Sequence, residues 1–169
     1  AGEERTIRIP DERPLTVYVD RRELVTLMTL GQYPEWLVLG YLLNQRLLPD
    51  LRQVDSVTVD WSVDAAAVRT RAGAAGSKAL RTRAVRPVVN TGCAQGTMFA
   101  GQMADLGTMR LPAVDVARID RATLLAALER MREQPSVHRE AGSVHGTALF
   151  HGSELLFFVE DVGRHNAVD

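Results

Sequence analysis

Hydrophobic and polar positions alternate in the first part of the chain. The alternation over residues 15–19 predicts a strand, and the polar run 20–23 predicts a turn. The returning strand is expected over residues 24–30, and Gly31 ends it. Residues 6–9 are a possible earlier strand. The sequence therefore predicts a β-hairpin in this part of the chain.

The hydrophobic spacing changes at Pro34 and predicts a helix that continues to about Arg46. Pro34 suits the first helical position, because the N–H that proline lacks would have no helical partner there. Glu35 favours the positive end of the same helix. Apolar residues, Trp36 among them, surround the helix axis. We therefore expect a largely buried core helix and not part of a cofactor site.

A second pair of strands is predicted over residues 54–61 and 67–70. Residues 72–77, Ala-Gly-Ala-Ala-Gly-Ser, are small and typical of a flexible linker. They indicate either a domain boundary or a long hairpin loop, and we favour the boundary. The expected division is a β-rich N-terminal portion with one helix, 1–77, and an α/β core, 78–169.

Strand and helix patterns follow one another in the second portion. Strands are predicted over 85–89, 144–150 and 155–159, and a hairpin-type turn joins the last two. Asp120 is expected to cap a helix over 122–132, where leucines recur at helical spacing. The predicted fold class is α/β, a mixed sheet with helices packed on it.

Composition narrows the possible classes of protein. The chain has 169 residues, of which 46% are hydrophobic and 24% charged, so it can bury a core and resembles neither a disordered nor a membrane protein. The net charge of -1 argues against a broadly basic nucleic-acid-binding protein. We identify no signal peptide and no apolar run of membrane-spanning length, so the expected location is cytoplasmic.

The single cysteine, Cys93, lies on a glycine-rich turn between Gly92 and Gly96. Glycine permits a sharp turn and the close approach of a large partner. Chemistry on sulfur requires such access, because the thiolate is the nucleophile and apolar burial keeps the thiol protonated. A lone cysteine is also common as a small buried packing residue, and the local sequence by itself slightly favours that role.

A polar cluster follows the apolar run 155–159. Its members are Asp161, Gly163, Arg164, His165 and Asn166. Ligands of open α/β sheets bind at the carboxyl ends of strands, which makes this cluster a candidate site. Arg164 suits a phosphate group, and His165 suits proton transfer or a phosphate hydrogen bond. A charged helix start capped by Asp161 is an equally good interpretation.

His145 lies in the glycine-rich segment 142–146, in a region that could face Cys93. A lone histidine on a strand is more often a structural residue than a catalyst. One cysteine with scattered histidines does not supply the closely spaced ligands of a structural zinc site, so we expect no structural zinc.

The polar cluster also resembles a known family. Residues 160–169, Glu-Asp-Val-Gly-Arg-His-Asn-Ala-Val-Asp, resemble the signature of the formate dehydrogenase accessory sulfurtransferases, the FdhD family. Residues 142–148 resemble that family's glycine-rich histidine segment, and residues 35–43 resemble its early helix. Cys93 falls where the family has its cysteine loop. The resemblance extends from about residue 12 to the end of the chain.

The resemblance implies a protein that accepts persulfide sulfur from a cysteine desulfurase. Such a protein delivers the sulfur to the molybdenum or tungsten bis-guanine-dinucleotide cofactor and so activates formate dehydrogenase. The resemblance also implies a core like that of cytidine deaminase without its zinc, and a homodimer. Cys93 would carry the persulfide. The residues expected to line or support the cofactor site are Gly92, Gly96, His145, Asp161, Gly163, Arg164, His165 and Asn166.

The chain departs from the family pattern in two ways. The family loop usually reads Cys-x-x-Cys, and Gly96 stands at the second cysteine position, so a relay between two cysteines is impossible here. Family chains normally continue well past the position of Asp169, so the deaminase-like core is expected to be incomplete. Two other functions stay open: a chaperone that binds the molybdenum cofactor without carrying sulfur and, with less support, a hydrolase of the deaminase type.

Overall fold

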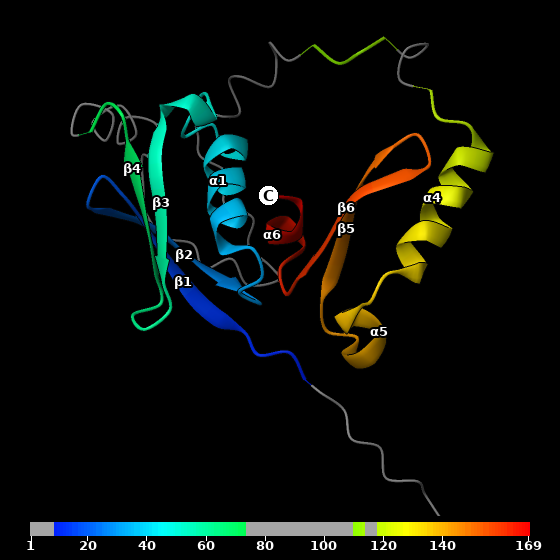
Figure 1. Ribbon diagram of the computed structural model, residues 1–169, viewed down its shortest axis with the longest axis horizontal. Coiled ribbons are helices and arrows are strands. Elements are labelled where there is room, and N and C mark those ends of the chain that lie inside the picture. Colours follow the sequence, from blue (N-terminus) through cyan, green and yellow to red (C-terminus); the bar gives the residue numbers. More distant parts are fainter. Residues whose placement is uncertain (1–8, 74–109, 114–117) are drawn as a thin grey trace, which may run out of the picture.

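The computed structural model describes residues 9–73, 110–113 and 118–169 (Figure 1). The first group of elements forms one sheet and its covering helix: β1 (Arg13–Val19), β2 (Arg22–Thr29), α1 (Pro34–Asn44), the 3-10 helix η1 (Leu51–Gln53), β3 (Val54–Asp60) and β4 (Ala65–Thr70). The second group follows: α4 (Arg121–Glu133), α5 (Val137–Ala141), β5 (His145–His151), β6 (Glu154–Asp161) and α6 (Arg164–Val168). Both sheets and helices are present, which confirms the α/β class.

The first sheet is mixed and has the strand order β2-β1-β4-β3. β1 pairs antiparallel with β2 and parallel with β4, and β3 pairs antiparallel with β4. Asp20 and Arg21 form the turn between β1 and β2, with φ angles of 47° and 68°. Two successive positive φ angles match the right-handed twist of a tight hairpin. The predicted hairpin is confirmed, although its second strand starts at Arg22, two residues earlier than expected.

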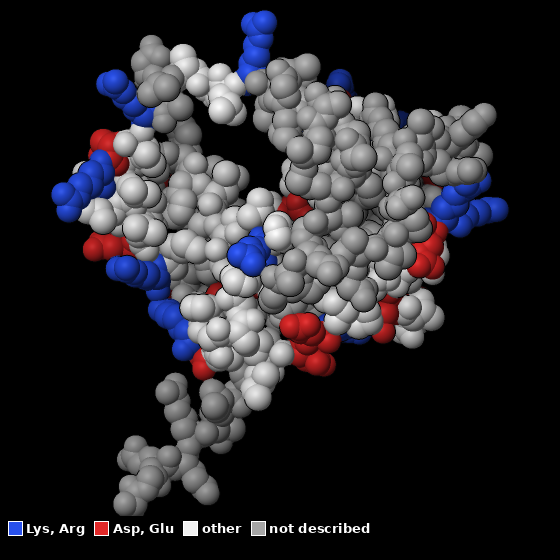
Figure 2. Space-filling view, turned by 180° about the vertical axis from the view of Figure 1, so that it is seen from behind, with Lys and Arg blue, Asp and Glu red and all other residues white. Residues whose placement is uncertain are grey.

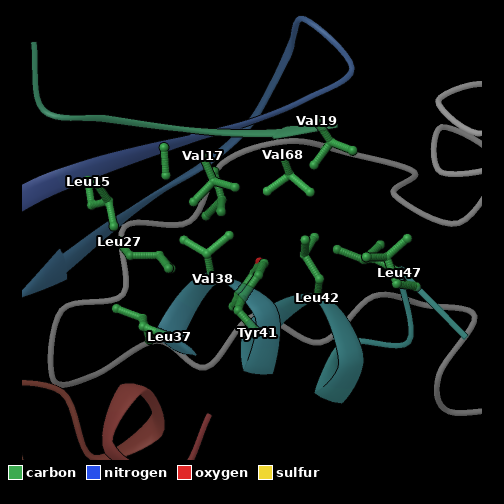
Figure 3. Packing of buried hydrophobic residues seen from close by; sticks show 13 residues of the cluster. Leu15, Val17, Val19, Leu27, Leu37, Val38, Tyr41, Leu42, Leu47 and Val68 are labelled. Carbon is green, nitrogen blue, oxygen red and sulfur yellow. The ribbon is translucent and has the colours of Figure 1, made fainter. Parts of the chain in front are cut away.

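The main hydrophobic core lies between this sheet and α1. Leu15, Val17 and Leu27 point from the sheet toward Val38 and Leu42 of α1 (Figure 3), and each of these side chains has a relative exposure of 0%. The alternation along β1 accounts for this arrangement, because every second residue of a strand points to the same face. Burying one such side chain contributes roughly 1.5–3 kcal/mol. This layer therefore holds the N-terminal portion together.

Helix α1 is buried along one face only. Leu37, Val38, Tyr41 and Leu42 are its buried residues, whereas Trp36 is 55% exposed. The expected core helix is present, but the assignment of Trp36 to its buried side is wrong. An apolar residue type does not reveal which face of a helix meets the sheet, and Trp36 lies on the other side.

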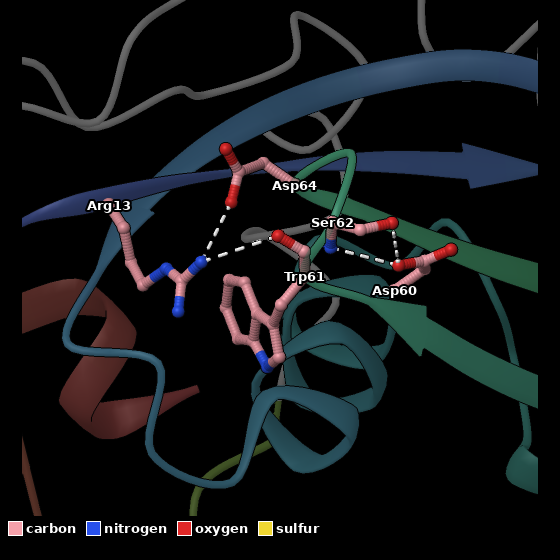
Figure 4. Close-up of polar contacts among 5 residues, drawn as sticks. All are labelled: Arg13, Asp60, Trp61, Ser62 and Asp64. Atoms are coloured by element: carbon pink, nitrogen blue, oxygen red, sulfur yellow. Dashed lines mark hydrogen bonds and ion pairs between the residues drawn. The ribbon is translucent and has the colours of Figure 1, made fainter.

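The turn between β3 and β4 is fastened to β1 by one arginine (Figure 4). Arg13 Nη2 lies 3.0 Å from Asp64 Oδ1, and its guanidinium carbon is 4.0 Å from the centroid of the Trp61 ring. A guanidinium over an indole is attracted by the electron-rich ring face. Gly31 lies against the same ring with a φ of 75°, and a Cβ there would come within 3.2 Å of Trp61.

The second group of elements centres on the antiparallel hairpin of β5 and β6, which matches the predicted strands and turn. Asp120 caps α4 as expected, because its Oδ1 accepts a hydrogen bond of 2.9 Å from Thr123 N. Helix α5 was not predicted from the sequence. At five residues it is too short to produce a hydrophobic period.

Several predictions concern residues that the structure does not describe. They are the strand over 85–89 and the boundary near residue 78, together with most of the 72–77 linker. Ile9 is described and does not belong to a strand, while residues 6–8 lie outside the described ranges. The mixed four-stranded sheet and α1 use only residues between Arg13 and Thr70.

The charged side chains of the described residues are interspersed on the face seen in Figure 2. Lys and Arg residues lie beside Asp and Glu residues among the described residues visible there. Among the described helices, none is long and apolar enough to cross a bilayer.

Candidate functional site

The polar segment after β6 folds into α6, which lies between α1 and the β5–β6 hairpin (Figure 1). Helix α6 and α1 approach each other closely at Gly40. A Cβ on Gly40 would lie 1.6 Å from the backbone oxygen of Asp169, so only glycine fits at this crossing. Asp169 therefore lies directly against α1, and Asn44 Nδ2 donates a hydrogen bond of 2.8 Å to its Oδ1.

Asp161 is buried, with 4% exposure, and its carboxylate joins the two portions of the chain. Oδ2 accepts hydrogen bonds from Thr29 Oγ1 at 2.5 Å and from Leu30 N at 3.2 Å. Oδ1 accepts from Gly163 N at 3.0 Å and from Asn166 Nδ2 at 3.1 Å. Four donors compensate for the desolvation of this carboxylate, as buried charges require. Asp161 therefore positions the end of β2 and the start of α6.

Asn166 also connects α6 to β2. It is 6% exposed, and its Nδ2 also donates to the backbone oxygen of Met28 at 2.7 Å. Gly163 makes room for this side chain, since a Cβ there would come within 3.2 Å of Asn166 Cγ. Three of the residues predicted for the site, Asp161, Gly163 and Asn166, are thus brought together in one hydrogen-bonded cluster.

The other predicted residues near this cluster are exposed. Arg164 and His165 lie in the first turn of α6 with exposed side chains. His145 is exposed at the start of β5 and is paired with Asp161 across the hairpin. In the segment 160–169, Asp161 and Asn166 are therefore buried, whereas Arg164 and His165 face solvent.

Glu160 is a buried carboxylate that the sequence analysis did not single out. It is 4% exposed, and its Oε1 accepts a hydrogen bond of 2.7 Å from Ser136 Oγ. Its Oε2 accepts from Val137 N at 2.6 Å, and its Oε1 also accepts from His138 N at 3.2 Å. Glu160 thereby satisfies the free N–H groups at the start of α5, which tethers that helix to β6.

A cavity of about 310 Å³ lies between α1, the hairpin and α6. Its lining is mostly apolar and includes Trp36, Leu149 and Phe157. Asp161, Asn166 and Asp169 add a few polar groups, so the cavity borders the hydrogen-bonded cluster directly. A mostly apolar cavity with a small number of polar groups is typical of a small-molecule site. We call this cavity the α1–β6 cleft.

Three aromatic rings form one wall of the α1–β6 cleft. The rings of Tyr33 and Trp36 are stacked, with centroids 5.0 Å apart and an interplanar angle of 14°. Phe157 lies 4.9 Å from Trp36 and 5.8 Å from Tyr33. Tyr33 is 49% exposed, so part of this wall faces solvent. Sequence reasoning missed this feature because it assigned Trp36 to the core.

Tyr33 also has an unusual backbone conformation. It precedes α1 with φ 47° and ψ 50°, the left-handed region that residues with a Cβ adopt at a cost. Strained residues are common at binding sites, where the surrounding structure holds them in place.

Burial changes the acid–base properties of two groups near the cleft. Burial raises the pKa of the Asp169 carboxyl, against the effect of the hydrogen bond from Asn44 Nδ2 and of the nearby His165. Burial, with the nearby Asp169 as a smaller cause, raises the pKa of Tyr41 to about 12. The Tyr41 hydroxyl is buried and has no hydrogen-bond partner within the described ranges.

Cys93, Gly92 and Gly96 lie outside the described residues. The position of the predicted sulfur carrier relative to the cleft therefore stays a prediction. Within the part of the chain that the structure describes, no group of three or more His, Cys, Asp or Glu residues is arranged to hold a metal ion.

The fold matches that of a solved structure. A crystal structure described as a formate dehydrogenase accessory protein from Desulfotalea psychrophila superposes with a TM-score of 0.66 at 18% identity. The match covers 93% of this chain and 54% of that protein. This likeness shows that the two proteins share a fold.

The family follows from the sequence comparison. The family model of the FdhD/NarQ family matches residues 10–169, and the chain belongs to this family. The protein named sulfur carrier protein FdhD from Bacillus subtilis (strain 168) is 29% identical over 163 residues, which are 96% of this chain and 60% of that protein. The protein of the same name from Sulfurisphaera tokodaii is 30% identical over 165 residues, again covering 60% of the relative. The chain thus spans about three fifths of the length of these curated relatives.

Proposed function

We propose that this protein carries persulfide sulfur on Cys93. It accepts the sulfur from a cysteine desulfurase and delivers it to a molybdenum or tungsten bis-guanine-dinucleotide group, the cofactor that formate dehydrogenase later uses. The observation that carries the proposal is the family match over residues 10–169, because the relatives found are named sulfur carrier proteins. Cys93 is the one thiol in the chain and therefore the one side chain able to carry a persulfide.

The loading step is a displacement at sulfur. The Cys93 thiolate attacks the outer sulfur of the donor persulfide, a new S–S bond forms, and the bond to the donor cysteine breaks. The donor leaves as a thiolate, and Cys93 holds the outer sulfur until transfer. Soft sulfur ligands suit the metal that receives it. One cysteine is sufficient for this step, so Gly96 at the second cysteine position does not prevent it.

The cofactor would be held beside the signature segment. The α1–β6 cleft supports this placement, because it is a cavity bordered by Asp161 and Asn166. Arg164 and His165 are exposed on the neighbouring turn and have the charge and donors that phosphate groups require. Asp161, Gly163 and Asn166 would support the site by positioning α6. Gly92, Gly96 and His145 complete the set of residues proposed to contact or shape it.

The test is intact-protein mass spectrometry after incubation with a cysteine desulfurase and free cysteine. The natural protein should gain the mass of one sulfur atom, and the gain should disappear on reduction. Cys93→Ala should show no gain, and His151→Ala, a change at the exposed hairpin turn, should load normally. A desulfurase that loads a two-cysteine relative but not this protein would refute the sulfur-carrier role.

A chaperone that binds the cofactor without carrying sulfur is the second candidate. The observation that favours it is Gly96, which removes the second cysteine of the family loop. Guanine-nucleotide binding that survives Cys93→Ala, together with no persulfide on the natural protein, would select this candidate. We further propose that the protein works as a homodimer, which light scattering during size-exclusion chromatography tests directly.

A further inference from the structure

We propose that the open edge of β6 binds an extended segment of a partner protein. The segment adds a strand to the β5–β6 hairpin and places a lysine or arginine side chain beside Glu140. The site is a second groove, which shares Tyr33 and Phe157 with the α1–β6 cleft and extends away from it toward α5. We call it the β6 edge groove. The proposal goes beyond the proposed function and does not depend on sulfur transfer.

The β6 edge groove follows the strand and has a volume of about 590 Å³. Every residue from Leu155 to Glu160 lines it, a stretch of roughly 17 Å in an extended chain. Among the described strands, β6 pairs with β5 alone. An edge strand presents N–H and C=O groups that can pair with another chain. A groove of this shape therefore fits an extended peptide better than a compact ligand.

Both sides of the groove are held in place by contacts to β6. Phe157 and Glu160 are three positions apart in the regular ladder, so they point to opposite faces of the hairpin, toward α1 and toward α4 and α5 (Figure 1). On the first face, the rings of Phe157 and Tyr33 have centroids 5.8 Å apart. On the second, the Glu160 carboxylate accepts from Ser136 Oγ at 2.7 Å and from Val137 N at 2.6 Å. The groove is thus preformed, which lowers the cost of binding.

A β-bulge presents one apolar side chain to the groove. Leu155 pairs with Phe150 and Phe157 pairs with Leu149, so Leu156 has no partner on β5. A bulge leaves its extra residue outside the ladder and changes the direction of the side chain. Leu156 is 54% exposed and lines the groove. An apolar residue of the partner segment covers this side chain.

The edge of β6 lacks the protection found at the edges of the other sheet. On β3, Asp55 forms an ion pair of 3.0 Å with Arg69 of β4, and such charges disfavour pairing with another chain. At the end of β2, Asn166 Nδ2 donates to Met28 O at 2.7 Å and occupies part of that edge. The run 155–159, Leu-Leu-Phe-Phe-Val, contains no charged residue. The sequence of β6 therefore favours the addition of a strand.

One exposed charge determines the chemistry of the partner segment. Glu140 of α5 is exposed and lines the groove. The described residues that line the groove include no lysine or arginine, and the Glu160 carboxylate is already bound to the start of α5. A basic side chain of the partner segment therefore meets a complementary charge, whereas an acidic one meets a like charge.

The test uses a fluorescein-labelled peptide of eight residues, the length of β6, in which valine and threonine alternate after an N-terminal lysine. Its fluorescence polarization should rise on titration with the whole chain. Only alternate residues of an added strand donate their N–H groups toward the sheet. N-methylation of one alternate set should therefore abolish binding, and N-methylation of the other set should preserve it. Loss of binding with both sets, or with neither, would overturn the addition of a strand.

Substitutions in the protein locate the binding site. Leu156→Lys should weaken binding roughly tenfold or more, because a lysine on an edge strand disfavours pairing and repels the basic peptide. Leu124→Lys changes a leucine of similar exposure on α4, outside the groove, and should bind normally. Glu140→Gln should weaken binding about twofold to fivefold, and norleucine in place of the peptide lysine should remove that difference. Equal affinities in Leu156→Lys and Leu124→Lys would overturn the site.

Light scattering during size-exclusion chromatography distinguishes a partner protein from a second copy of this chain. The bound peptide should leave the oligomeric state unchanged. Dissociation of a dimer by the peptide would overturn the proposal, because the edge would then be an interface between copies. A natural protein that gives no rise in polarization would also overturn it, since the edge would then be closed to an added strand.

Discussion

Replacing Thr29 by Val should destabilise the protein far more than the loss of one hydroxyl group at a surface site. Thr29 is 0% exposed, and its Oγ1 donates to the Asp161 carboxylate at 2.5 Å while it accepts from Gly31 N at 3.1 Å. Valine has the same shape and can do neither. Hydrogen bonds to charged groups contribute roughly 1.5–3 kcal/mol each, so we expect a loss of about 2–3 kcal/mol in the free energy of unfolding.

The matched control is Thr26→Val on the same strand. Thr26 Oγ1 shares a hydrogen bond of 3.0 Å with Thr16 Oγ1, a neutral pair that is half-buried. Such a bond contributes about 0.5–1.5 kcal/mol. Urea denaturation followed by far-UV circular dichroism gives both free energies, provided that the dependence on urea concentration is unchanged between variants.

A double-mutant cycle then tests the contact itself. Asp161→Asn replaces one acceptor oxygen with an NH₂ group, which must face at least one N–H donor from Leu30, Gly163 or Asn166. The double variant Asp161→Asn/Thr29→Val should lose less unfolding free energy than the two single variants together. The difference should be about 1 kcal/mol or more, because both changes remove the same interaction. Strict additivity, or equal losses for Thr29→Val and Thr26→Val, would refute the reasoning.

Three further substitutions have definite expected outcomes. Tyr41→Phe should raise the free energy of unfolding at pH 7 by roughly 1 kcal/mol, because the hydroxyl has no partner among the described residues. Burial raises the pKa of Tyr41 from 10.0 to about 12, so stability should fall more steeply between pH 10 and pH 12 in the natural protein than in Tyr41→Phe. Gly40→Ala should lower the melting temperature by several degrees in calorimetry although alanine favours helices, because its Cβ would collide with Asp169. Glu160→Gln should speed hydrogen exchange at the amides of Val137 and His138. The glutamine side chain has one neutral acceptor oxygen, whereas the Glu160 carboxylate accepts these hydrogen bonds with two charged oxygens.

Local patterns predicted the elements well because their causes are local. The alternation in β1, proline at the start of α1 and the Asp120 cap each act within a few residues, and each was found where expected. The exposure of Trp36 could not be predicted, since it depends on how α1 sits on a sheet whose strands are distant in sequence. The short helix α5 depends on Glu160, which lies more than twenty residues away.

The same distinction applies to the candidate site. Composition alone identified the polar segment after β6, but it gave no means of separating residues that face inward from those that face outward. Asp161 faces inward because it accepts a hydrogen bond from Thr29 on β2. The two residues are 132 positions apart in the sequence, so no local pattern indicates this contact. The aromatic wall was missed for the same reason: Tyr33 and Phe157 meet only after the two portions of the chain pack together.

This division changes how substitutions in the signature segment should be interpreted. Asp161 and Asn166 bind the end of β2, so removing either side chain perturbs the fold before it perturbs any ligand. A loss of activity in Asp161→Ala is therefore not evidence that Asp161 contacts the cofactor. Arg164 and His165 are exposed, and neither belongs to the hydrogen-bonded cluster of Asp161, Gly163 and Asn166. If the proposed function is correct, Arg164→Gln should reduce cofactor delivery, and the unfolding free energy of the same variant shows whether the fold is affected. Unaltered delivery in Arg164→Gln would show that the outward-facing half of the segment does not contribute to the site.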